Sequence, residues 1–219
     1  MNNRTGPPGP SEIERLSLSI IDAEVPEPRP FEGDEWVIVR RMIHTSADFE
    51  LLELVDFHPD AIEAGLGAIT RGCLLATDTE MVKVGIGPRR LEKWRCTVEC
   101  HIGDEEVVRR SRGEGITRAS AAVDRVFNRI NGGIYVIGNA PTALMRLLDL
   151  VESGLCRPAL VVGMPVGFVN AAESKERLVE QGRVPYITIR GRKGGSALAA
   201  TVINALAGLA KERIQKEIP

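Results

Sequence analysis

The sequence is short of aromatic residues and cysteines, and it lacks a long apolar run. Phe, Trp and Tyr make up 4% of the 219 residues, and there are four cysteines. No two cysteines form a C-x-x-C pair, and Cys96, Cys100 and His101 are spaced one residue too widely for haem attachment. We therefore expect reduced cysteines, as is typical of the cytosol. No stretch is long and apolar enough to span a bilayer, and no apolar run follows a basic start. We predict a cytoplasmic protein without a membrane partner.

An excess of charge of one sign is also missing. The chain carries 28 Lys and Arg against 30 Asp and Glu, a formal net charge of -2. This balance gives no overall attraction for nucleic acid, so we predict no nucleic-acid partner, and any anion site must be built locally. There is no H-x-x-x-H motif or His/Cys cluster to indicate a metal site, and no G-x-S-x-G motif of serine hydrolases.

The N-terminal region is expected to form an arm. Residues 1–10 are polar and rich in Pro and Gly, which predicts a disordered tail, and residues 11–219 are predicted to form a single domain. Apolar residues recur at helical spacing over residues 11–23, and three prolines in residues 25–30 then end that helix.

Short apolar runs alternate with helical patterns over the rest of the chain. The expected strands are residues 73–76, 96–102, 134–137, 159–162 and 186–189. The expected helices are residues 59–70, 77–84, 105–110, 116–130, 141–152, 171–180 and 196–211. This alternation predicts an α/β fold, a three-layer doubly wound sheet of about five mainly parallel strands with the N-terminal helical arm attached.

One histidine has chemically useful neighbours. Trp36, Val39 and Ile43 recur at helical intervals, although residues 36–39 also fit a strand. In a helix, Arg40, Arg41 and Asp48 would share a face with His44 and make the imidazole a proton donor that works near neutral pH. A packing or surface role for His44 is the alternative.

Three expected strand ends carry small residues before a helix, over residues 138–142, 163–168 and 190–196. Glycine lets the backbone approach a ligand, and helix N-termini attract anions. Arg190, Arg192 and Lys193 add positive charge, so the loops predict a ligand with several carboxylates or phosphates. The alternatives are ordinary turns and a solvated charge run. None of the loops has a dinucleotide or Walker motif.

These segments together resemble the precorrin-8X methylmutase family. The resemblance rests on Arg41-Met42-Ile43-His44, Thr117-Arg118, and the blocks at residues 138–144, 164–169 and 190–197. Two positions depart from the pattern: Asn170 stands where members commonly carry glycine, and Ala119-Ser120 reverses the usual order.

The resemblance implies a homodimeric isomerase without a cofactor or metal. It would move a methyl group from C-11 to C-12 of precorrin-8 or cobalt-precorrin-8, giving hydrogenobyrinate or cobyrinate in cobalamin biosynthesis. The resemblance implies His44 as the catalytic histidine, acting as the general acid. From the residues themselves, we hypothesise that Asp48 supports protonated His44 and that Arg41 keeps its pKa from rising far. The implied substrate-binding residues are Ser17, Arg41, Thr45, Asp48, Arg118, Gly138, Asn139, Ala140, Met164, Gly167, Arg190, Arg192, Lys193 and Ser196. Two alternative hypotheses for the function are a corrinoid-binding protein without catalytic activity and a phosphometabolite enzyme on an α/β scaffold.

Overall fold

The computed structural model describes residues 9–217 and contains one six-stranded sheet in the order β1-β6-β5-β4-β2-β3. Five strands run parallel, as predicted. They are β2 (Leu74–Thr77), β3 (Thr97–Cys100), β4 (Ile134–Ile137), β5 (Leu160–Gly163) and β6 (Tyr186–Ile189). Every residue of β4, β5 and β6 is buried, because helices cover both faces of the sheet.

The sequence did not predict the sixth strand, β1 (Val55–Phe57). It pairs antiparallel with β6, with Val55 opposite Ile189. Its three residues directly follow the short helix α3 (Leu51–Leu54), so no strand-like alternation could develop around them.

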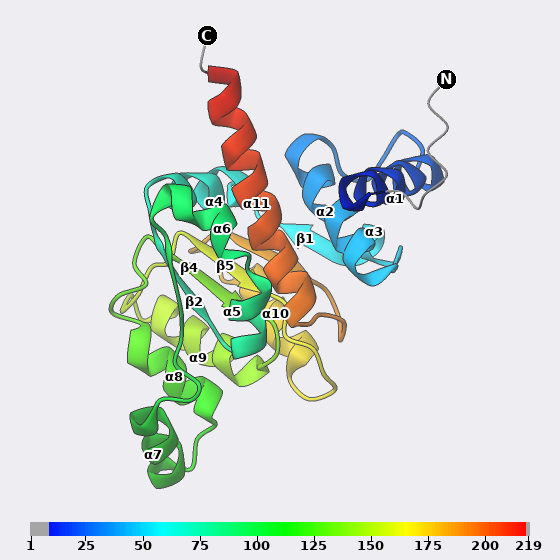
Figure 1. Cartoon of the computed structure of the whole chain (residues 1–219). Helices are drawn as coiled ribbons and strands as arrows, with labels where there is room; N and C mark the ends of the chain where they lie inside the picture. Colours follow the sequence, from blue (N-terminus) through cyan, green and yellow to red (C-terminus); the bar gives the residue numbers. More distant parts are fainter. Residues whose placement is uncertain (1–8, 218–219) are drawn as a thin grey trace, which may run out of the picture.

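Two helical layers enclose the sheet, which confirms the three-layer prediction (Figure 1). One apolar cluster joins the sheet to α2 (Gly33–Ser46), α4 (Ala61–Thr70), α5 (Glu80–Gly85) and α11 (Ser196–Glu217). The other joins it to α8 (Arg118–Val126), α9 (Pro141–Glu152) and α10 (Ala171–Glu180). The helical reading of residues 36–39 is confirmed, and their strand alternative is wrong.

Several predicted boundaries need correction. The helix expected over residues 116–130 spans only Arg118–Val126. It begins at Arg118 because the Thr117 side chain accepts a hydrogen bond from the Ser120 N–H and caps the helix. The helix expected from residue 77 begins at Glu80, since Thr77 completes β2. Two short segments, α6 (Pro88–Leu91) and the 3-10 helix η1 (Glu92–Trp94), were not predicted, and α7 (Glu105–Glu114) projects from the body (Figure 1).

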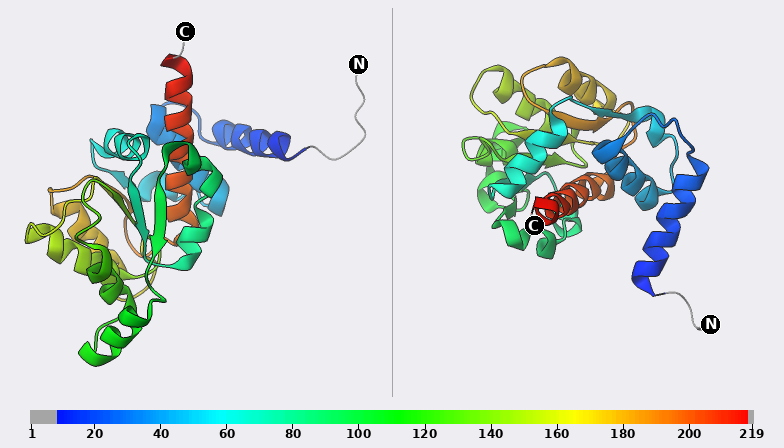
Figure 2. Two further views of the ribbon diagram at one scale, coloured as in Figure 1. Left: turned by 60° about the vertical axis from the view of Figure 1, so that its left-hand side comes forward. Right: turned by 90° about the horizontal axis from the view of Figure 1, so that it is seen from above.

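The N-terminal arm is helix α1 (Pro10–Glu24), which stands away from the body in both views of Figure 2. Residues 1–8 of the tail predicted for residues 1–10 lie outside the described residues. Pro10, the last residue of that predicted tail, already belongs to the helix. Polar contacts fasten α1 to α2: Arg40 Nη1 lies 2.6 Å from Asp22 Oδ2, and Arg41 Nη1 lies 2.9 Å from Glu14 Oε1.

Helices α2 and α11 lie antiparallel on the same layer. Arg213 of α11 pairs with Asp34 at the start of α2, at 2.6 Å. At the other end, Thr45 Oγ1 of α2 lies 2.9 Å from Thr201 Oγ1 of α11. The end of α2 therefore lies beside the first turns of α11. Over residues 9–217, none of the helices combines the length and the apolar composition needed to cross a bilayer.

Candidate active site

The loops that follow the parallel strands meet at the carboxyl edge of the sheet, and a buried carboxylate organises one of them. Asp78, which follows β2, accepts hydrogen bonds from the backbone N–H groups of Gly138, Asn139 and Ala140 at 3.0, 2.8 and 2.7 Å. Its side chain is buried, which raises its pKa, while the three donors oppose that rise. Asp78 thus fixes the loop after β4.

Sequence reasoning missed this role because it placed Asp78 in a helix. The available signal was an acidic residue directly after a buried strand, next to Thr77, but its partners lie 60 or more residues away.

The loops after β5 and β6 interlock. The Gly195 N–H donates to the Met164 carbonyl at 2.9 Å, and the Gly167 N–H donates to the Arg192 carbonyl at 3.2 Å. A Cβ on Gly194 would lie 2.3 Å from the Met164 carbonyl oxygen, so only glycine fits there. Met164 was predicted to contact ligand; its side chain is completely buried in the core, so a contact through its backbone stays a prediction.

The loop after β4 also reaches the start of α11. A Cβ on Gly138 would lie 2.6 Å from Ser196 Cα, and the Ser196 hydroxyl lies 3.3 Å from Thr79 Oγ1. The predicted residues Gly138, Asn139, Ala140, Gly167 and Ser196 therefore belong to one connected group of loops.

His44 lies in the last turn of α2 and is exposed. Its Nδ1 lies 2.7 Å from the Ser17 hydroxyl of α1, so the structure brings these two predicted residues together. The next residue, Thr45, bonds to the Arg41 carbonyl and to Thr201 of α11. These contacts hold the histidine end of α2 between the arm and the first turns of α11.

The predicted surroundings of the imidazole are wrong for Asp48, whereas Arg40 and Arg41 share helix α2 with His44 as predicted. Helix α2 ends at Ser46 and Ala47 adopts a left-handed conformation, with φ 53°, so Asp48 leaves the helical face of His44. Arg40 and Arg41 bond to Asp22 and Glu14 of α1.

Asp48 contacts the cationic loop after β6. Its carboxylate lies 2.6 Å from Lys193 Nζ, and this hydrogen bond lowers the pKa of Asp48 and raises that of Lys193. Glu50 also pairs with Lys193, at 2.7 Å. Asp48 therefore connects the end of α2 to the β6 loop and does not bond to His44.

The other two cations of this loop point to different partners. Arg190 Nε lies 2.8 Å from Asp56 Oδ2 of β1, and Arg192 lies over the Phe168 ring at 5.5 Å. Among the ion pairs of the described residues, Arg192 has no carboxylate partner. Arg192 is thus the cation of this loop that remains available to an anionic ligand.

Two further cations border these loops. Arg118 is exposed at the first position of α8, whose cap Thr117 lies 2.8 Å from Thr142 of α9, just after the β4 loop. Lys175 of α10 is 1% exposed and donates to the Lys193 carbonyl at 2.6 Å. Burial lowers the pKa of Lys175 to about 8.

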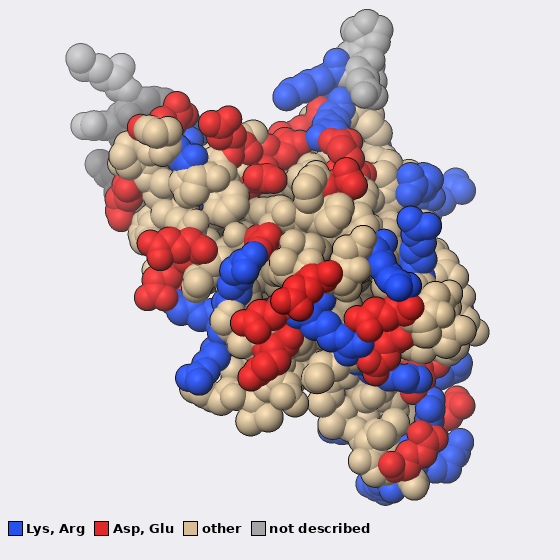
Figure 3. All heavy atoms as spheres, turned by 180° about the vertical axis from the view of Figure 1, so that it is seen from behind, with Lys and Arg blue, Asp and Glu red and all other residues tan. Residues whose placement is uncertain are grey.

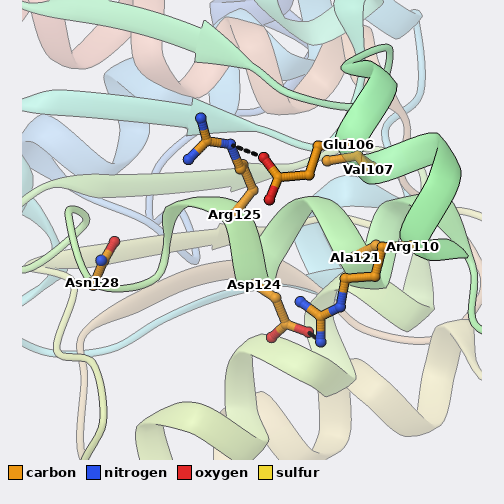
Figure 4. A pocket seen from close by; sticks show the side chains of 7 residues that line it. All are labelled: Glu106, Val107, Arg110, Ala121, Asp124, Arg125 and Asn128. Carbon is orange, nitrogen blue, oxygen red and sulfur yellow. Dashed lines mark ion pairs between the residues drawn. The ribbon is translucent and has the colours of Figure 1, made fainter. Parts of the chain in front are cut away.

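A separate cavity between α7 and α8 is a weaker candidate (Figure 4). It encloses about 170 Å³ and is polar, but its charges are already paired. Arg110 lies 2.9 Å from Asp124, and Arg125 lies 3.5 Å from Glu106. Within residues 9–217, no three His, Cys, Asp or Glu side chains form a group that could hold a metal. Charges of both signs are interspersed on the face opposite that of Figure 1 (Figure 3).

A histidine held by a hydroxyl, with helix N-termini at the carboxyl edge of a parallel sheet, is typical of α/β enzymes, a class that commonly binds ligands beyond the strand ends. Comparison with known proteins identifies the family within this class. A family model described as precorrin-8X methylmutase matches residues 12–209. The chain therefore belongs to the precorrin-8X methylmutase family, whose members are intramolecular methyl-transferring isomerases of cobalamin biosynthesis.

Individual relatives match over nearly the whole chain. The cobalt-precorrin-8 methylmutase of Priestia megaterium is 43% identical over 208 residues, covering 95% of this chain and 92% of its own. The precorrin-8X methylmutase of Pseudomonas aeruginosa is 40% identical, covering 89% and 93%. The solved structure of the Thermus thermophilus precorrin-8x methyl mutase superposes with a TM-score of 0.85 at 43% identity, covering 92% and 96%.

Proposed function

We propose that the chain moves a methyl group from C-11 to C-12 of precorrin-8 or cobalt-precorrin-8, giving hydrogenobyrinate or cobyrinate, with His44 as the general acid. The single observation that carries this proposal is the contact between His44 Nδ1 and the Ser17 hydroxyl, at 2.7 Å. With Nδ1 occupied, Nε2 is left for the substrate, since it carries no hydrogen bond within the described residues.

The proposed chemistry needs only orientation and proton donation. Protonation of, or hydrogen bonding to, a ring nitrogen beside the migrating methyl draws electron density from the π system, and the methyl then shifts within the same molecule. General acid assistance of this kind contributes about 10²–10⁴-fold. The remaining acceleration would come from holding the ring in one orientation.

The loops supply that orientation. Corrinoid acetate and propionate groups are anionic, and the N-termini of α9 and α11 present backbone N–H groups at the same edge. Arg192 and Arg118 are the exposed cations proposed to bind carboxylates, whereas Arg190 and Lys193 hold the loop to Asp56 and Asp48. Both cobalt-bearing and cobalt-free substrates are included because relatives with either name match almost equally well.

The direct test is turnover. Purified protein is incubated with precorrin-8 and, separately, with cobalt-precorrin-8, and the absorbance change to the product chromophore is followed. We expect His44→Ala to bind the substrate and to lose turnover. Wild-type protein that binds either ring without converting it would instead support the corrinoid-binding alternative, and near-normal turnover by His44→Ala would refute the assignment of the acid.

We also propose that the chain forms a homodimer through α1. Ile13, Leu16 and Ile20 lie on one face of this projecting helix and are 52%, 55% and 48% exposed. A contiguous apolar face of this kind is typical of an interface. Sedimentation of the wild type should give a dimer that Leu16→Glu converts to monomer, whereas Glu12→Gln, on the same helix, should remain dimeric. A monomeric wild type would refute the proposal. The cytoplasmic location stays a prediction.

A further inference from the structure

Two cysteines lie together at the amino edge of the sheet, away from the candidate active site. Cys73 directly precedes β2 and Cys96 directly precedes β3. The first register pair of these parallel strands is Leu74 opposite Thr97, so Cys73 and Cys96 are opposite each other one position earlier. The Thr97 N–H donates to the Cys73 carbonyl at 3.2 Å, which holds the two backbones together at that point.

The turns before both strands are packed tightly. Gly72 has a positive φ of 78°, and a Cβ there would lie 2.6 Å from the Trp94 carbonyl oxygen. Arg95 is left-handed, with φ 56°, and the Cys96 thiol donates to the Ile69 carbonyl at 3.4 Å. These contacts fix the backbone next to both thiols. The fold itself therefore holds Cys73 and Cys96 close to each other.

This geometry suits a disulfide. Neighbouring strands lie about 4.8 Å apart, and register partners point to the same face. Disulfides join Cα atoms separated by about 4.4–6.8 Å. Both side chains also pack against the same apolar cluster. No large backbone movement is needed to bond the two sulfurs.

The two thiols differ in reactivity. The proximity of the two thiols lowers the pKa of Cys96 and raises that of Cys73. Burial raises the pKa of Cys100, and that of Cys156 to about 11. The thiolate needed for nucleophilic attack therefore forms more readily on Cys96 than on the other three cysteines.

Cys96 also borders a cavity through which a small molecule can reach it. It lines an apolar cavity of about 600 Å³, together with Lys83, Val84, Ile86, Leu91, Glu92 and Val98. Cys73 is not among the lining residues. The cavity therefore gives a small reagent a route to Cys96, whose register partner on the neighbouring strand is Cys73.

We propose that Cys73 and Cys96 form a thiol–disulfide exchange site that takes small organic disulfides through this cavity. The Cys96 thiolate attacks one sulfur of the reagent, forms a mixed disulfide and releases one thiolate. Cys73 then attacks the Cys96 sulfur, the Cys73–Cys96 disulfide forms, and the second reagent thiol leaves with the Cys73 proton. Two protein thiols are oxidised and one reagent disulfide is reduced to two thiols.

The test uses the full chain and bis(2-hydroxyethyl) disulfide at neutral pH, followed by non-reducing peptide mass mapping. We expect a Cys73–Cys96 linked peptide, two hydrogens lighter than its parts. Cys73→Ser should accumulate the mixed disulfide on Cys96, and Cys96→Ser should leave Cys73 free. The matched control Cys100→Ser should form the link at the wild-type rate.

A second measurement needs no variant. With limiting iodoacetamide at neutral pH, Cys96 of the wild type should be alkylated about tenfold or more faster than Cys100 and Cys156, because more of it is thiolate. Equal labelling of these cysteines, or a link that forms only in denaturant, would overturn the proposal.

Discussion

The Ser17 hydroxyl of the projecting arm lies 2.7 Å from Nδ1 of His44. Because this contact orients the imidazole, we expect Ser17→Ala to lower kcat about two- to tenfold, the usual effect of losing one hydrogen bond. The alkaline limb of the kcat–pH profile, which a general acid governs, should also move. Ser19→Ala is the matched control, since Ser19 is on the same helix and bonds only to the Leu16 carbonyl. An equal effect of both variants would show that Ser17 acts through helix stability alone.

Asp48→Asn tests the connection between α2 and the cationic loop. Asp48 bonds to Lys193 and not to His44, so the variant should raise KM and leave the alkaline limb of the profile, which His44 would govern, in place. The bond lowers the pKa of Asp48, so the stability that it contributes is present at neutral pH and is lost as the pH falls through that lowered value. Glu50→Gln, which alters the more exposed partner of Lys193, should have a smaller effect. A shifted alkaline limb in Asp48→Asn would restore a direct role beside His44.

Lys175 predicts an unusual dependence of stability on pH. Burial lowers its pKa to about 8, so between that value and 10.5 the unfolded chain binds more protons than the folded chain. Stability from this group therefore rises with pH across that window. Relative to Lys175→Met, the Tm of the wild type should increase between about pH 7 and about pH 10. Lys211→Met, which changes an exposed lysine of α11, should show no such trend. A constant difference between the wild type and Lys175→Met would contradict the prediction.

Gly138→Ala should disrupt the contact between the β4 loop and α11. The new Cβ would meet backbone atoms of Ser196 at 2.6 and 2.9 Å, and the backbone cannot move away as a flexible side chain would. We expect a loss of about 1–3 kcal/mol in the free energy of unfolding, measured by denaturant titration. Gly208→Ala, inside α11 with no atom within 4 Å, should instead gain about 0.5–1 kcal/mol. A Gly138→Ala variant as stable as the wild type would show that the loop and helix separate easily.

Most of the fold could be predicted from the sequence because the patterns that mark its strands and helices are local. The buried strands are continuous apolar runs, and the helices repeat at helical spacing, so both could be recognised within a few residues. The short strand β1 lacked such a run. The end of α2 was equally hidden, because Ala47 takes the left-handed position that glycine usually marks.

The site could be predicted only as a set of residues. His44 and the loops were identified, but their partners depend on contacts across the chain: Asp48 meets Lys193 from 145 residues away, and Asp78 reaches Gly138 from 60 residues away. Spacing rules apply within one helix or strand, so they assigned Asp48 to the wrong neighbour.

Strand β1 also protects the protein against aggregation. Without it, β6 would present unpaired N–H and C=O groups along an apolar edge, which other chains could extend into a larger sheet. The three residues of β1 cover that edge, and β1 itself carries Asp56, paired with Arg190. At the opposite edge, β3 carries Glu99, paired with Arg129 at 2.6 Å. Each outer strand therefore ends the sheet with a charged side chain, which discourages intermolecular strand pairing.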